Sequence, residues 1–300
     1  MIVVFGSVAL DLVTNVPRIP APGESLACPD YALVPGSKGG NQALAAARSG
    51  AKVVHVATVG RDEHAELATA LLKAEGVDLS HLARSDRATG LCLVTVAADG
   101  ENTVIAAAGA NLDTRVTQLD TLEFGRQDTL IFQMEVTLSE NFAAVALARR
   151  RGARTLLNAA PAQRVPEETL RALDILVVNE HEAMIVAEAV GLSVSEPTEA
   201  AEALHRTYGC STIVTLGPKG AQAWHEGALL DVSAPRIVPV DTTSAGDSFV
   251  GAFAAALDAG SDFPTALRRG VVAGSLACTL PGAQTSIPRL ADILSFSTDF

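Results

Sequence analysis

Short β-branched runs alternate along this chain with longer alanine-rich segments, and this alternation constrains the fold more than any other feature. The runs are Ile2–Phe5, Val53–Thr58, Leu130–Phe132, Thr155–Asn158, Ile175–Val178 and Thr212–Leu216. The segments of helical length between them are Gln42–Ser49, Glu63–Glu75, Ser139–Arg150, Glu180–Ala189 and Glu199–Tyr208. The alternation predicts an α/β fold with a mostly parallel central sheet covered on both faces. Such sheets bind ligands beyond the carboxyl ends of their strands.

Two segments interrupt the alternation. Leu12–Pro35 is rich in proline and has no helical stripe, and Gly90–Ala107 has the pattern of two strands around a turn. We expect them to form a small sheet near the ligand edge and interpret it as a lid over the substrate, the alternative being ordinary surface hairpins. The expected main domain comprises residues 1–11, 36–89 and 108–300, and the lid comprises 12–35 and 90–107.

The charge balance excludes several classes of partner. The 300 residues include 22 basic and 34 acidic side chains, a net charge of −12, which disfavours general affinity for nucleic acid or anionic membranes. The four cysteines form no CxxC pair and suit a reducing compartment. The N-terminus lacks the basic region and cleavage site of a signal peptide, and the longest uncharged stretch, Gly270–Pro288, poorly suits a membrane helix. We therefore expect a cytoplasmic protein.

The stretch Val240–Gly251, VDTTSAGDSFVG, is the most informative for chemistry. Its small residues allow backbone N–H groups to point outward, and the apolar helical run that follows adds a positive dipole end, so an anion cradle is expected. Asp247 lies at the mouth of this cradle, where its carboxylate could accept a proton from a hydroxyl that attacks phosphorus. The competing interpretation is that Asp241 or Asp247 only caps a helix.

A glycine cluster, VPGSKGGNQ at Val34–Gln42, lies between the predicted lid and a helix. It lacks the order of a Walker A motif, which argues against a P-loop NTPase. Its glycines allow close approach of a ligand, and Lys38 and Asn41 are suited to holding hydroxyl groups. The alternative is glycine turn chemistry at a helix start.

A third cluster places Asn179 and Glu182 three residues apart, on the first turn of a helix that follows a strand. Acidic side chains there are commonly only dipole partners, but they could also hold Mg²⁺ through water. His181 lies between them without the spacing of a zinc site.

Together these residues resemble, in order and spacing, the ribokinase-like (PfkB) sugar kinases. The segments that carry the resemblance are Gly36–Ala43, Asn179–Glu182, Thr215–Gly220 and Asp241–Asp247. Further segments are most similar to the ribokinases of that family: Gly6–Asp11, Gly109–Asn111, Gln133–Glu135, Asn158–Ala162 and Gly282–Gln284. The resemblance covers nearly the whole chain, and the Asp241–Asp247 signature is its most specific part.

The resemblance implies a three-layer α/β/α domain with a small β-sheet lid, which transfers the γ-phosphoryl group of ATP to a sugar hydroxymethyl group. The implied cofactors are ATP, Mg²⁺ and K⁺, and the first implied substrate is D-ribose, giving ribose 5-phosphate. The lids of two subunits pair in relatives, so a homodimer is expected. Three alternatives remain: a kinase for another sugar such as a ketohexose or modified pentose, a nucleoside kinase, and a non-catalytic sugar-binding regulator.

The resemblance also implies roles for individual residues. Asp247 matches the catalytic base, and the anion hole is matched by Ser244, Ala245 and Gly246. The sugar-contacting positions are matched by Asp11, Ser37, Lys38, Gly39, Asn41, Glu135 and Asp247. The nucleotide-contacting positions are matched by Asn179, Thr215, Gly217, Lys219, Gly220 and Gly246. Mg²⁺ is expected at Asn179 and Glu182 through water, and a monovalent cation at Asp241, Thr243, Ala277, Leu280, Gly282 and Ser286.

Three departures from the family pattern bear on the substrate. Ribokinases commonly carry Asn where this chain has Ala9, Ser37 replaces a usual glycine, and Ser244 replaces a usual Gly or Ala. A lost buried hydrogen bond is worth about 1 to 3 kcal/mol, enough to change substrate preference without changing the reaction. The presence of Asp247 disfavours a pure binder, and Tyr31 is the sole aromatic residue of the two lid segments, which disfavours a nucleoside kinase.

Overall fold

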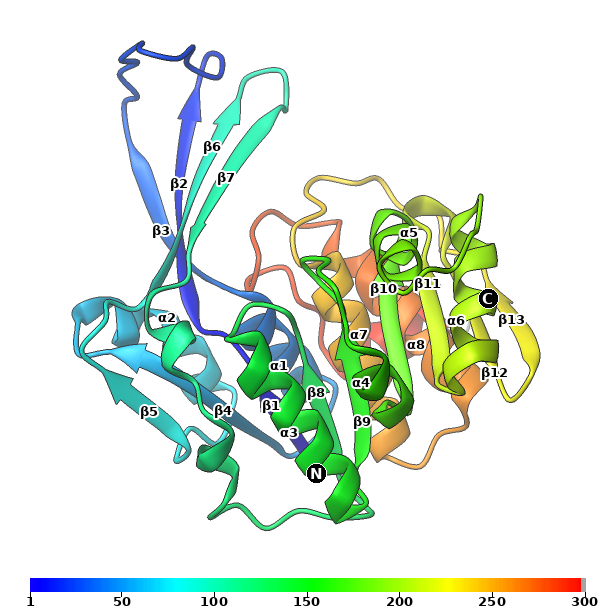
Figure 1. The fold of residues 1–300 in the computed structure, drawn as a ribbon. Coiled ribbons are helices and arrows are strands. Elements are labelled where there is room, and N and C mark those ends of the chain that lie inside the picture. Colours follow the sequence, from blue (N-terminus) through cyan, green and yellow to red (C-terminus); the bar gives the residue numbers. More distant parts are fainter. Residues whose placement is uncertain (298–300) are drawn as a thin grey trace.

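The computed structural model describes residues 1–297, which form two β-sheets (Figure 1). The larger sheet has nine strands in the order β13-β12-β11-β10-β9-β8-β1-β4-β5. These strands are β1 (Ile2–Phe5), β4 (Val53–Gly60), β5 (Leu82–Ser85), β8 (Thr129–Phe132), β9 (Arg154–Asn158), β10 (Ile175–Asn179), β11 (Ser211–Thr215), β12 (Ala221–His225) and β13 (Ala228–Val232). From β11 to β5 all neighbours pair in parallel, and β12 and β13 add an antiparallel hairpin at one edge. The predicted mostly parallel sheet is confirmed.

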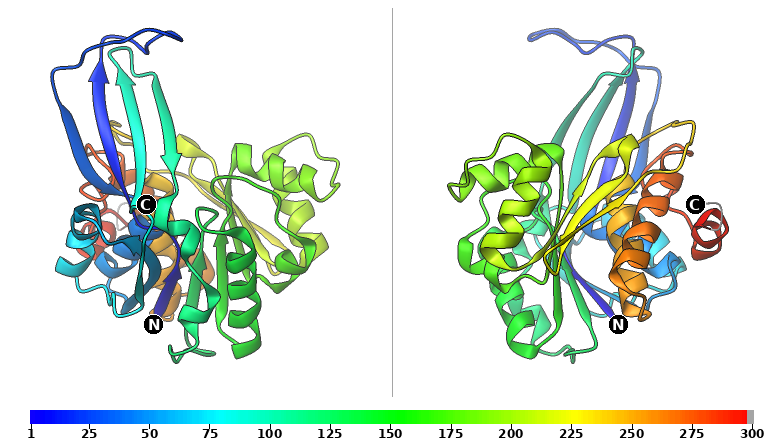
Figure 2. Two further views of the ribbon diagram at one scale, coloured as in Figure 1. Left: turned by 60° about the vertical axis from the view of Figure 1, so that its left-hand side comes forward. Right: turned by 90° about the vertical axis from the view of Figure 1, so that its right-hand side faces the viewer.

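Helices cover both faces of this sheet and complete three layers (Figure 2). One face is covered by α1 (Lys38–Arg48), α7 (Ala245–Asp258) and α8 (Phe263–Ala277), and the other by α3 (Leu138–Arg151), α4 (Glu167–Ala172), α5 (Glu180–Ala189) and α6 (Pro197–Tyr208). Helix α2 (Glu63–Ala74) packs against the smaller sheet, and α9 (Leu290–Ser297) packs against α8. Within residues 1–297, no helix combines the length and the apolar character that crossing a bilayer requires.

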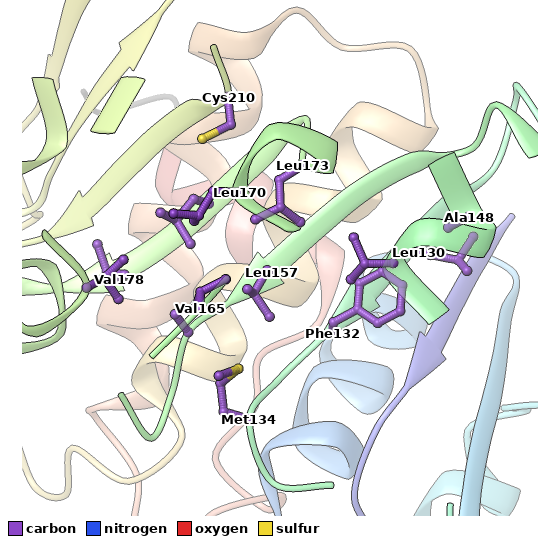
Figure 3. Packing of buried hydrophobic residues seen from close by; sticks show 14 of the residues in the cluster. Leu130, Phe132, Met134, Ala148, Leu157, Val165, Leu170, Leu173, Val178 and Cys210 are labelled. Carbon is purple, nitrogen blue, oxygen red and sulfur yellow. The ribbon is translucent and has the colours of Figure 1, made fainter. Parts of the chain in front are cut away.

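The central strands are buried on both faces because each face meets a helical layer. In β1, Val3 and Phe5 contribute to the core beneath α3 to α6, whereas Ile2 and Val4 contribute to the core beneath α1, α7 and α8. Figure 3 shows part of the first core, where side chains such as Phe132 pack between the strands and α3. Full burial of one such side chain contributes about 1.5 to 3 kcal/mol to the free energy of folding. The apolar strands, which alternate with helices along the chain, are therefore stable only between two helical layers.

The smaller sheet stands away from the larger one in both views of the molecule (Figures 1 and 2). Its strands are β2 (Ala9–Val16), β3 (Tyr31–Gly36), β6 (Gly90–Ala97) and β7 (Asn102–Ala107), in the order β3-β2-β6-β7. The outer pairs are antiparallel, but β2 and β6 are parallel, because each belongs to a separate passage of the chain out of the larger sheet. The two segments that interrupt the helix–strand alternation therefore meet in one sheet.

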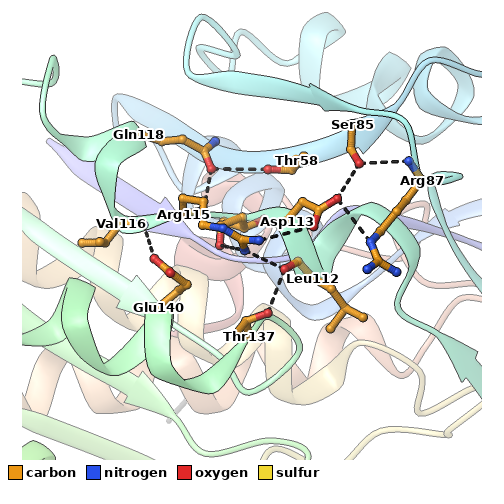
Figure 4. Close-up of polar contacts among 11 residues, drawn as sticks. Thr58, Ser85, Arg87, Leu112, Asp113, Arg115, Val116, Gln118, Thr137 and Glu140 are labelled. Carbon is orange, nitrogen blue, oxygen red and sulfur yellow. Dashed lines mark hydrogen bonds and ion pairs between the residues drawn. The ribbon is translucent and has the colours of Figure 1, made fainter.

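Polar contacts fix the chain where it returns from the smaller sheet to β8 (Figure 4). Two 3₁₀ turns, η1 (Gly109–Asp113) and η2 (Val116–Leu119), form this return. The Asp113 carboxylate accepts a 2.5 Å hydrogen bond from Ser85 Oγ and forms an ion pair with Arg87. The Gln118 amide donates to the carbonyls of Ala57 and His81, at 2.8 and 3.2 Å. These contacts attach the return segment to β4 and β5.

The glycine cluster after β3 differs from the expected loop. Helix α1 begins at Lys38 rather than Gln42, so the residues Lys38 to Asn41 form its first turn. Ser37 is the N-cap, and its hydroxyl accepts a hydrogen bond from the Gly40 N–H at 3.2 Å. A Cβ at Gly39 would lie 2.4 Å from the Ser7 nitrogen, so a glycine is required there for α1 to approach the end of β1.

Candidate active site

Asp247 lies on the first turn of α7 and is almost fully buried, with 7% of its surface exposed. Ser244, immediately before the helix, has a left-handed backbone with φ 60°, which turns the chain sharply into α7. Its hydroxyl donates to the Ala283 carbonyl at 2.8 Å and does not cap the helix. The Ala245 N–H donates to the Thr242 carbonyl at 3.3 Å. The next two N–H groups, of Gly246 and Asp247, have no backbone partner within residues 1–297 and lie at the lining of the adjoining cavity, where an anion can accept from them.

Both carboxylate oxygens of Asp247 accept hydrogen bonds from α1. Asn41 Nδ2 donates to Oδ2 and Gln42 Nε2 donates to Oδ1, each at 2.9 Å. Burial raises the pKa of Asp247 to about 6, and the positive charge of Lys38 together with these two amide donors acts in the opposite direction. The result is a carboxylate that is ionised at neutral pH and accepts a proton more readily than an exposed aspartate.

Lys38 lies at the start of α1 among several carboxylates. Burial disfavours its charged form, but the negative charges of Asp247, Glu135 and Glu182 raise its pKa above the ordinary value. A permanently positive side chain therefore stands beside the candidate base.

A second cavity, of about 420 Å³, opens beside Glu135. Glu135 Oε2 accepts hydrogen bonds from Ser7 Oγ at 2.6 Å and from the Lys38 N–H at 2.9 Å, which fixes the carboxylate between β1 and α1. Most of the cavity wall is apolar and includes Ala9 and Met134. Of the residues expected to contact the sugar, Ser37 and Glu135 line this cavity, and its other polar side chains are those of Cys92, Asn111, Thr137 and Gln163.

Asp11, on β2, lies near the root of the smaller sheet. Burial raises its pKa above the ordinary value, a hydrogen bond from the Cys92 thiol lowers it, and the negative charge of Glu135 raises it. The thiol itself is shielded, and burial beside these two carboxylates raises the pKa of Cys92 to about 12. Asp11 and Glu135 thus act on each other electrostatically across the region where hydroxyl groups were expected to bind.

A larger cavity, of about 730 Å³, lies on the other side of the α7 N-terminus. Its apolar surface includes Ile237, Phe249 and Val271, and its rim includes Thr215 and Gly246. The remaining lining residues are Gly217, Pro218, Gly220, Ala234, Pro235, Arg236, Pro239, Thr242, Ala245, Gly274, Ser275 and Cys278. A flat aromatic base fits such a lining. Four of the six expected nucleotide-contacting positions line this cavity, namely Thr215, Gly217, Gly220 and Gly246. Asn179 lines a smaller cavity instead, and Lys219 is exposed and lines neither.

A smaller cavity, of about 220 Å³, adjoins the larger one. Its lining includes Lys38, Asp247, Asn179 and Glu182, and it shares Gly246 with the larger cavity. The phosphate end of a nucleotide in the larger cavity can therefore reach the base, the lysine and the positive end of α7.

The residues expected to bind Mg²⁺ are joined in a capping box. Asn179 Oδ1 accepts from the Glu182 N–H at 2.8 Å, and Glu182 Oε2 accepts from the Asn179 N–H at 2.9 Å. Burial raises the pKa of Glu182, while the Asn179 N–H and Lys38 lower it. Within residues 1–297 no group of three His, Cys, Asp or Glu side chains gathers as a metal site. One carboxylate and one amide oxygen fit an ion that keeps most of its water, as Mg²⁺ does.

Two segments expected to hold a monovalent cation lie together. Asp241 Oδ1 accepts from the Thr243 hydroxyl at 2.6 Å, and its Oδ2 accepts from the Gly282 N–H at 2.9 Å. Ser286 Oγ donates to the Ala283 carbonyl at 3.0 Å. Ala277 is buried nearby at the end of α8, whereas Leu280 has 54% of its surface exposed.

Three residues at the site were not assigned a role from the sequence. Gln42 donates to Asp247, Asn158 accepts from Gln42 Nε2 at 3.0 Å, and Ser7 donates to Glu135. Each lies inside or next to a motif that was recognised. The missing signal was their three-dimensional position, since an amide or hydroxyl carries no chemistry of its own that marks it as part of a site.

Comparisons with known proteins show which family this chain belongs to. The family model for pfkB family carbohydrate kinases matches residues 1–290. The chain is 35% identical to a ribokinase of Haemophilus influenzae over 296 residues, which is 98% of this chain and 97% of that protein. A ribokinase of Thermotoga maritima superposes with a TM-score of 0.92 at 29% identity and covers 99% of both chains. An Arabidopsis thaliana ribokinase solved with ribose and ATP gives a TM-score of 0.87 at 27% identity, over 98% of this chain and 97% of that one. A match of this extent places the chain in the pfkB family of carbohydrate kinases.

Proposed function

We propose that this carbohydrate kinase transfers the γ-phosphoryl group of ATP to the hydroxymethyl group of D-ribose and so forms ribose 5-phosphate. The observation that carries the proposal is the buried carboxylate of Asp247, which lies beside Lys38 at the N-terminus of α7 in a cavity continuous with a base-sized apolar one. The similarity to ribokinases over the whole chain supports ribose as the acceptor.

Sugar hydroxyls are held by carboxylate and amide oxygens in this proposal. Asp11 and Glu135 accept hydrogen bonds from hydroxyl groups, and Lys38 donates to them. Asn41 Oδ1 is buried and has no partner among residues 1–297, although its Nδ2 is engaged by Asp247. An incoming hydroxyl satisfies this oxygen, and the bound sugar is then held next to the base.

The transfer step follows from that placement. Asp247 takes the proton of the hydroxymethyl group as its oxygen attacks the γ-phosphorus, and the bond from phosphorus to the leaving oxygen of ADP breaks. The N–H groups at Ser244, Ala245 and Gly246 and the charge of Lys38 stabilise the negative charge on the transferring group. Mg²⁺, held through water by Asn179 and Glu182, would supply further neutralisation of the phosphates.

Three further properties belong to the proposal. The smaller sheet closes over the sugar as a lid, with residues 12–35 and 90–107 as the lid and the remaining residues as the main domain. Pairing of two such sheets gives a homodimer, since Tyr31, Leu93, Val104 and Ile105 expose apolar surface on these strands. A potassium ion beside Asp241 supports the anion hole. The location is cytoplasmic, in keeping with four free cysteines.

A panel assay tests the proposal. ATP turnover is measured against pentoses, hexoses and nucleosides, and the phosphorylated position is identified by ³¹P and ¹³C NMR. We expect ribose to give the highest kcat/KM, with phosphate on the hydroxymethyl oxygen. Absence of ATP-dependent phosphorylation of any panel member would reject the function.

A kinase for another sugar is the second candidate, and one observation favours it. Ala9 is 95% buried in the wall of the cavity beside Glu135 and presents only a methyl group there. A higher kcat/KM for another sugar than for ribose would support this second candidate.

A further inference from the structure

A chain of buried side-chain amides runs from the core of the larger sheet to the candidate base. Gln133 Nε2 donates to Gln42 Oε1 at 2.8 Å, and Gln42 Nε2 in turn donates to Asp247 Oδ1 at 2.9 Å. Gln42 and Gln133 are both fully buried. Gln133 follows β8, Gln42 lies on α1 and Asp247 lies on α7, so the chain links three elements that are distant in sequence.

We propose that Gln42 and Gln133 are positioning residues that fix the orientation of the Asp247 carboxylate and keep it supplied with a hydrogen-bond donor. Neither touches the substrate in the proposed reaction. That Gln42 and Gln133 orient the carboxylate is inferred from the hydrogen-bond geometry alone. That this orientation affects catalysis rests on the proposed function.

The role of Gln133 follows from the two-sided nature of an amide. A glutamine side chain can present either its NH₂ group or its oxygen to a neighbour, and only the NH₂ group stabilises a carboxylate. Because the Gln133 NH₂ group occupies Gln42 Oε1, the Gln42 NH₂ group must face Asp247. Asn158 Oδ1 accepts from the same Gln42 Nε2 at 3.0 Å and reinforces this orientation.

The position of Gln133 is itself constrained. A Cβ at Gly6 would lie 2.0 Å from Gln133 Oε1, so the glycine at the end of β1 leaves the space that this side chain occupies. Asn141 Nδ2 donates to the Gln133 carbonyl at 2.7 Å and holds its backbone. The amide chain therefore has little freedom to rearrange around the carboxylate.

The charged groups around the carboxylate are few. Lys38, from the start of α1, favours its ionised form, and Glu135, from the segment after β8, opposes it. Glu182, from the first turn of α5, lines the same small cavity and is a further negative group. Helix α8 also packs against α7, but its arginines, Arg268 and Arg269, lie in its first half, and it meets the first turn of α7 through Gly274. Loss of an amide donor is therefore not compensated by a cation from another helix.

The test is a pH titration of the Asp247 carboxyl in the intact chain, monitored by ¹³C NMR of samples labelled at aspartate. The Asp247 signal is assigned by its absence in Asp247→Asn. Gln42→Met keeps the shape of the side chain and removes the donor, and we expect the pKa of Asp247 to rise by about one unit, as for loss of one donor to a carboxylate. Gln133→Met frees Gln42 to rotate, and we expect a rise of at least about half a unit. The double variant should titrate like Gln42→Met, because Gln133 acts through Gln42.

Gln118→Met is the matched control. Gln118 is a half-buried glutamine of η2 whose side-chain amide also donates two hydrogen bonds, to the carbonyls of Ala57 and His81, far from Asp247 (Figure 4). It should leave the titration of Asp247 unchanged. An unchanged pKa in Gln42→Met, or additive shifts in the double variant, would overturn the inference. If Gln42→Met does not fold, the shift or its absence in Gln133→Met decides.

Kinetics separate this inference from the proposed function. If the protein phosphorylates a sugar, the acid limb of its kcat/KM profile should move to higher pH in Gln42→Met and Gln133→Met. The shift should equal the rise in the pKa of Asp247 that NMR measures. With no turnover on any acceptor, the proposed function fails, while the titration still accepts or rejects the amide chain.

Discussion

The crossing of α1 and α7 depends on Gly251, and replacing it by alanine tests how the candidate base is held. Gly251 lies four residues after Asp247, on the same face of α7. An added Cβ would lie 2.4 Å from Ala45 Cβ and 2.7 Å from both the Ala46 nitrogen and the Gln42 carbonyl oxygen. None of these atoms can rotate away, so the helices must separate.

The size of the effect follows from these distances. Restoring an ordinary contact of 3.4 Å requires a displacement of about 1 Å. The 2.9 Å hydrogen bonds from Asn41 and Gln42 to Asp247 then stretch beyond useful length. We expect Gly251→Ala to lower the free energy of unfolding by about 1 to 3 kcal/mol and kcat by about 100-fold.

The assays are urea unfolding and steady-state turnover at saturating ATP and sugar. Gly125→Ala is the matched control, because a Cβ there meets nothing nearer than the Arg151 carbonyl at 3.7 Å. The control should match the wild type in both assays. Wild-type kcat and stability in Gly251→Ala would refute the reasoning, since the helices would then tolerate the methyl group without moving the carboxylate.

Four further predictions follow from the site and the core. Asp247→Asn should lower kcat about 10²- to 10⁴-fold while calorimetry still detects sugar binding, and retention of more than about a tenth of the activity would argue against a base at this position. His55 is fully buried, neither ring nitrogen has a partner within residues 1–297, and burial lowers its pKa to about 4. In the unfolded chain the His55 imidazole binds a proton near pH 6.5, so the free energy of unfolding should fall by about 3 kcal/mol as the pH drops from about 6.5 to about 4. His55→Leu should remove this part of the pH dependence in urea unfolding experiments. Ala9→Asn should raise kcat/KM for ribose relative to other sugars several-fold, the value of one hydrogen bond of about 1 kcal/mol, if ribose is not already the best substrate; a clear preference of the wild type for ribose would make Ala9 a neutral replacement. Activity should rise with KCl and stay low with NaCl alone, and equal rates in both salts would count against the cation site near Asp241.

The layers of the fold were predictable because burial on both faces leaves a strong pattern. Strands such as β1 and β10 are continuous β-branched runs, and the predicted bounds of α5, Glu180–Ala189, agree with the structure. The start of α1 was not predictable from periodicity, because Gly39 and Gly40 have low helix propensity. Gly39 is packed closely against the backbone of Gly6 and Ser7, directly after β1. Helix α8 and the β12–β13 hairpin had no expected counterpart. For α8 a start signal was present and was missed, since Asp262 is its N-cap, accepting from the Thr265 N–H, and a proline stands in its first turn.

The site was predictable where a motif carries recognisable chemistry. Asp247 and Lys38 come from such motifs, and the structure brings them into one cavity. Gln42 and Gln133 could not be found in this way, because what matters is that an amide from one helix meets an amide after a strand 91 residues away. That contact depends on how α1 packs against β8 in three dimensions, which a single sequence does not show.

The root of the smaller sheet is also part of the wall of the cavity beside Glu135. Ala9 pairs with Gly36 on one side and with Gly90 on the other, and the Asn111 side chain bonds both the N–H and the carbonyl of Val8 at 2.9 and 3.1 Å. A tilt of the sheet about this row therefore changes the shape of the cavity at its apolar end. If the smaller sheet moves as the proposed lid, a substitution at Ala9 changes both the cavity wall and the row of residues about which the sheet tilts, so sugar selectivity and the rate of lid opening should change together in any variant made there.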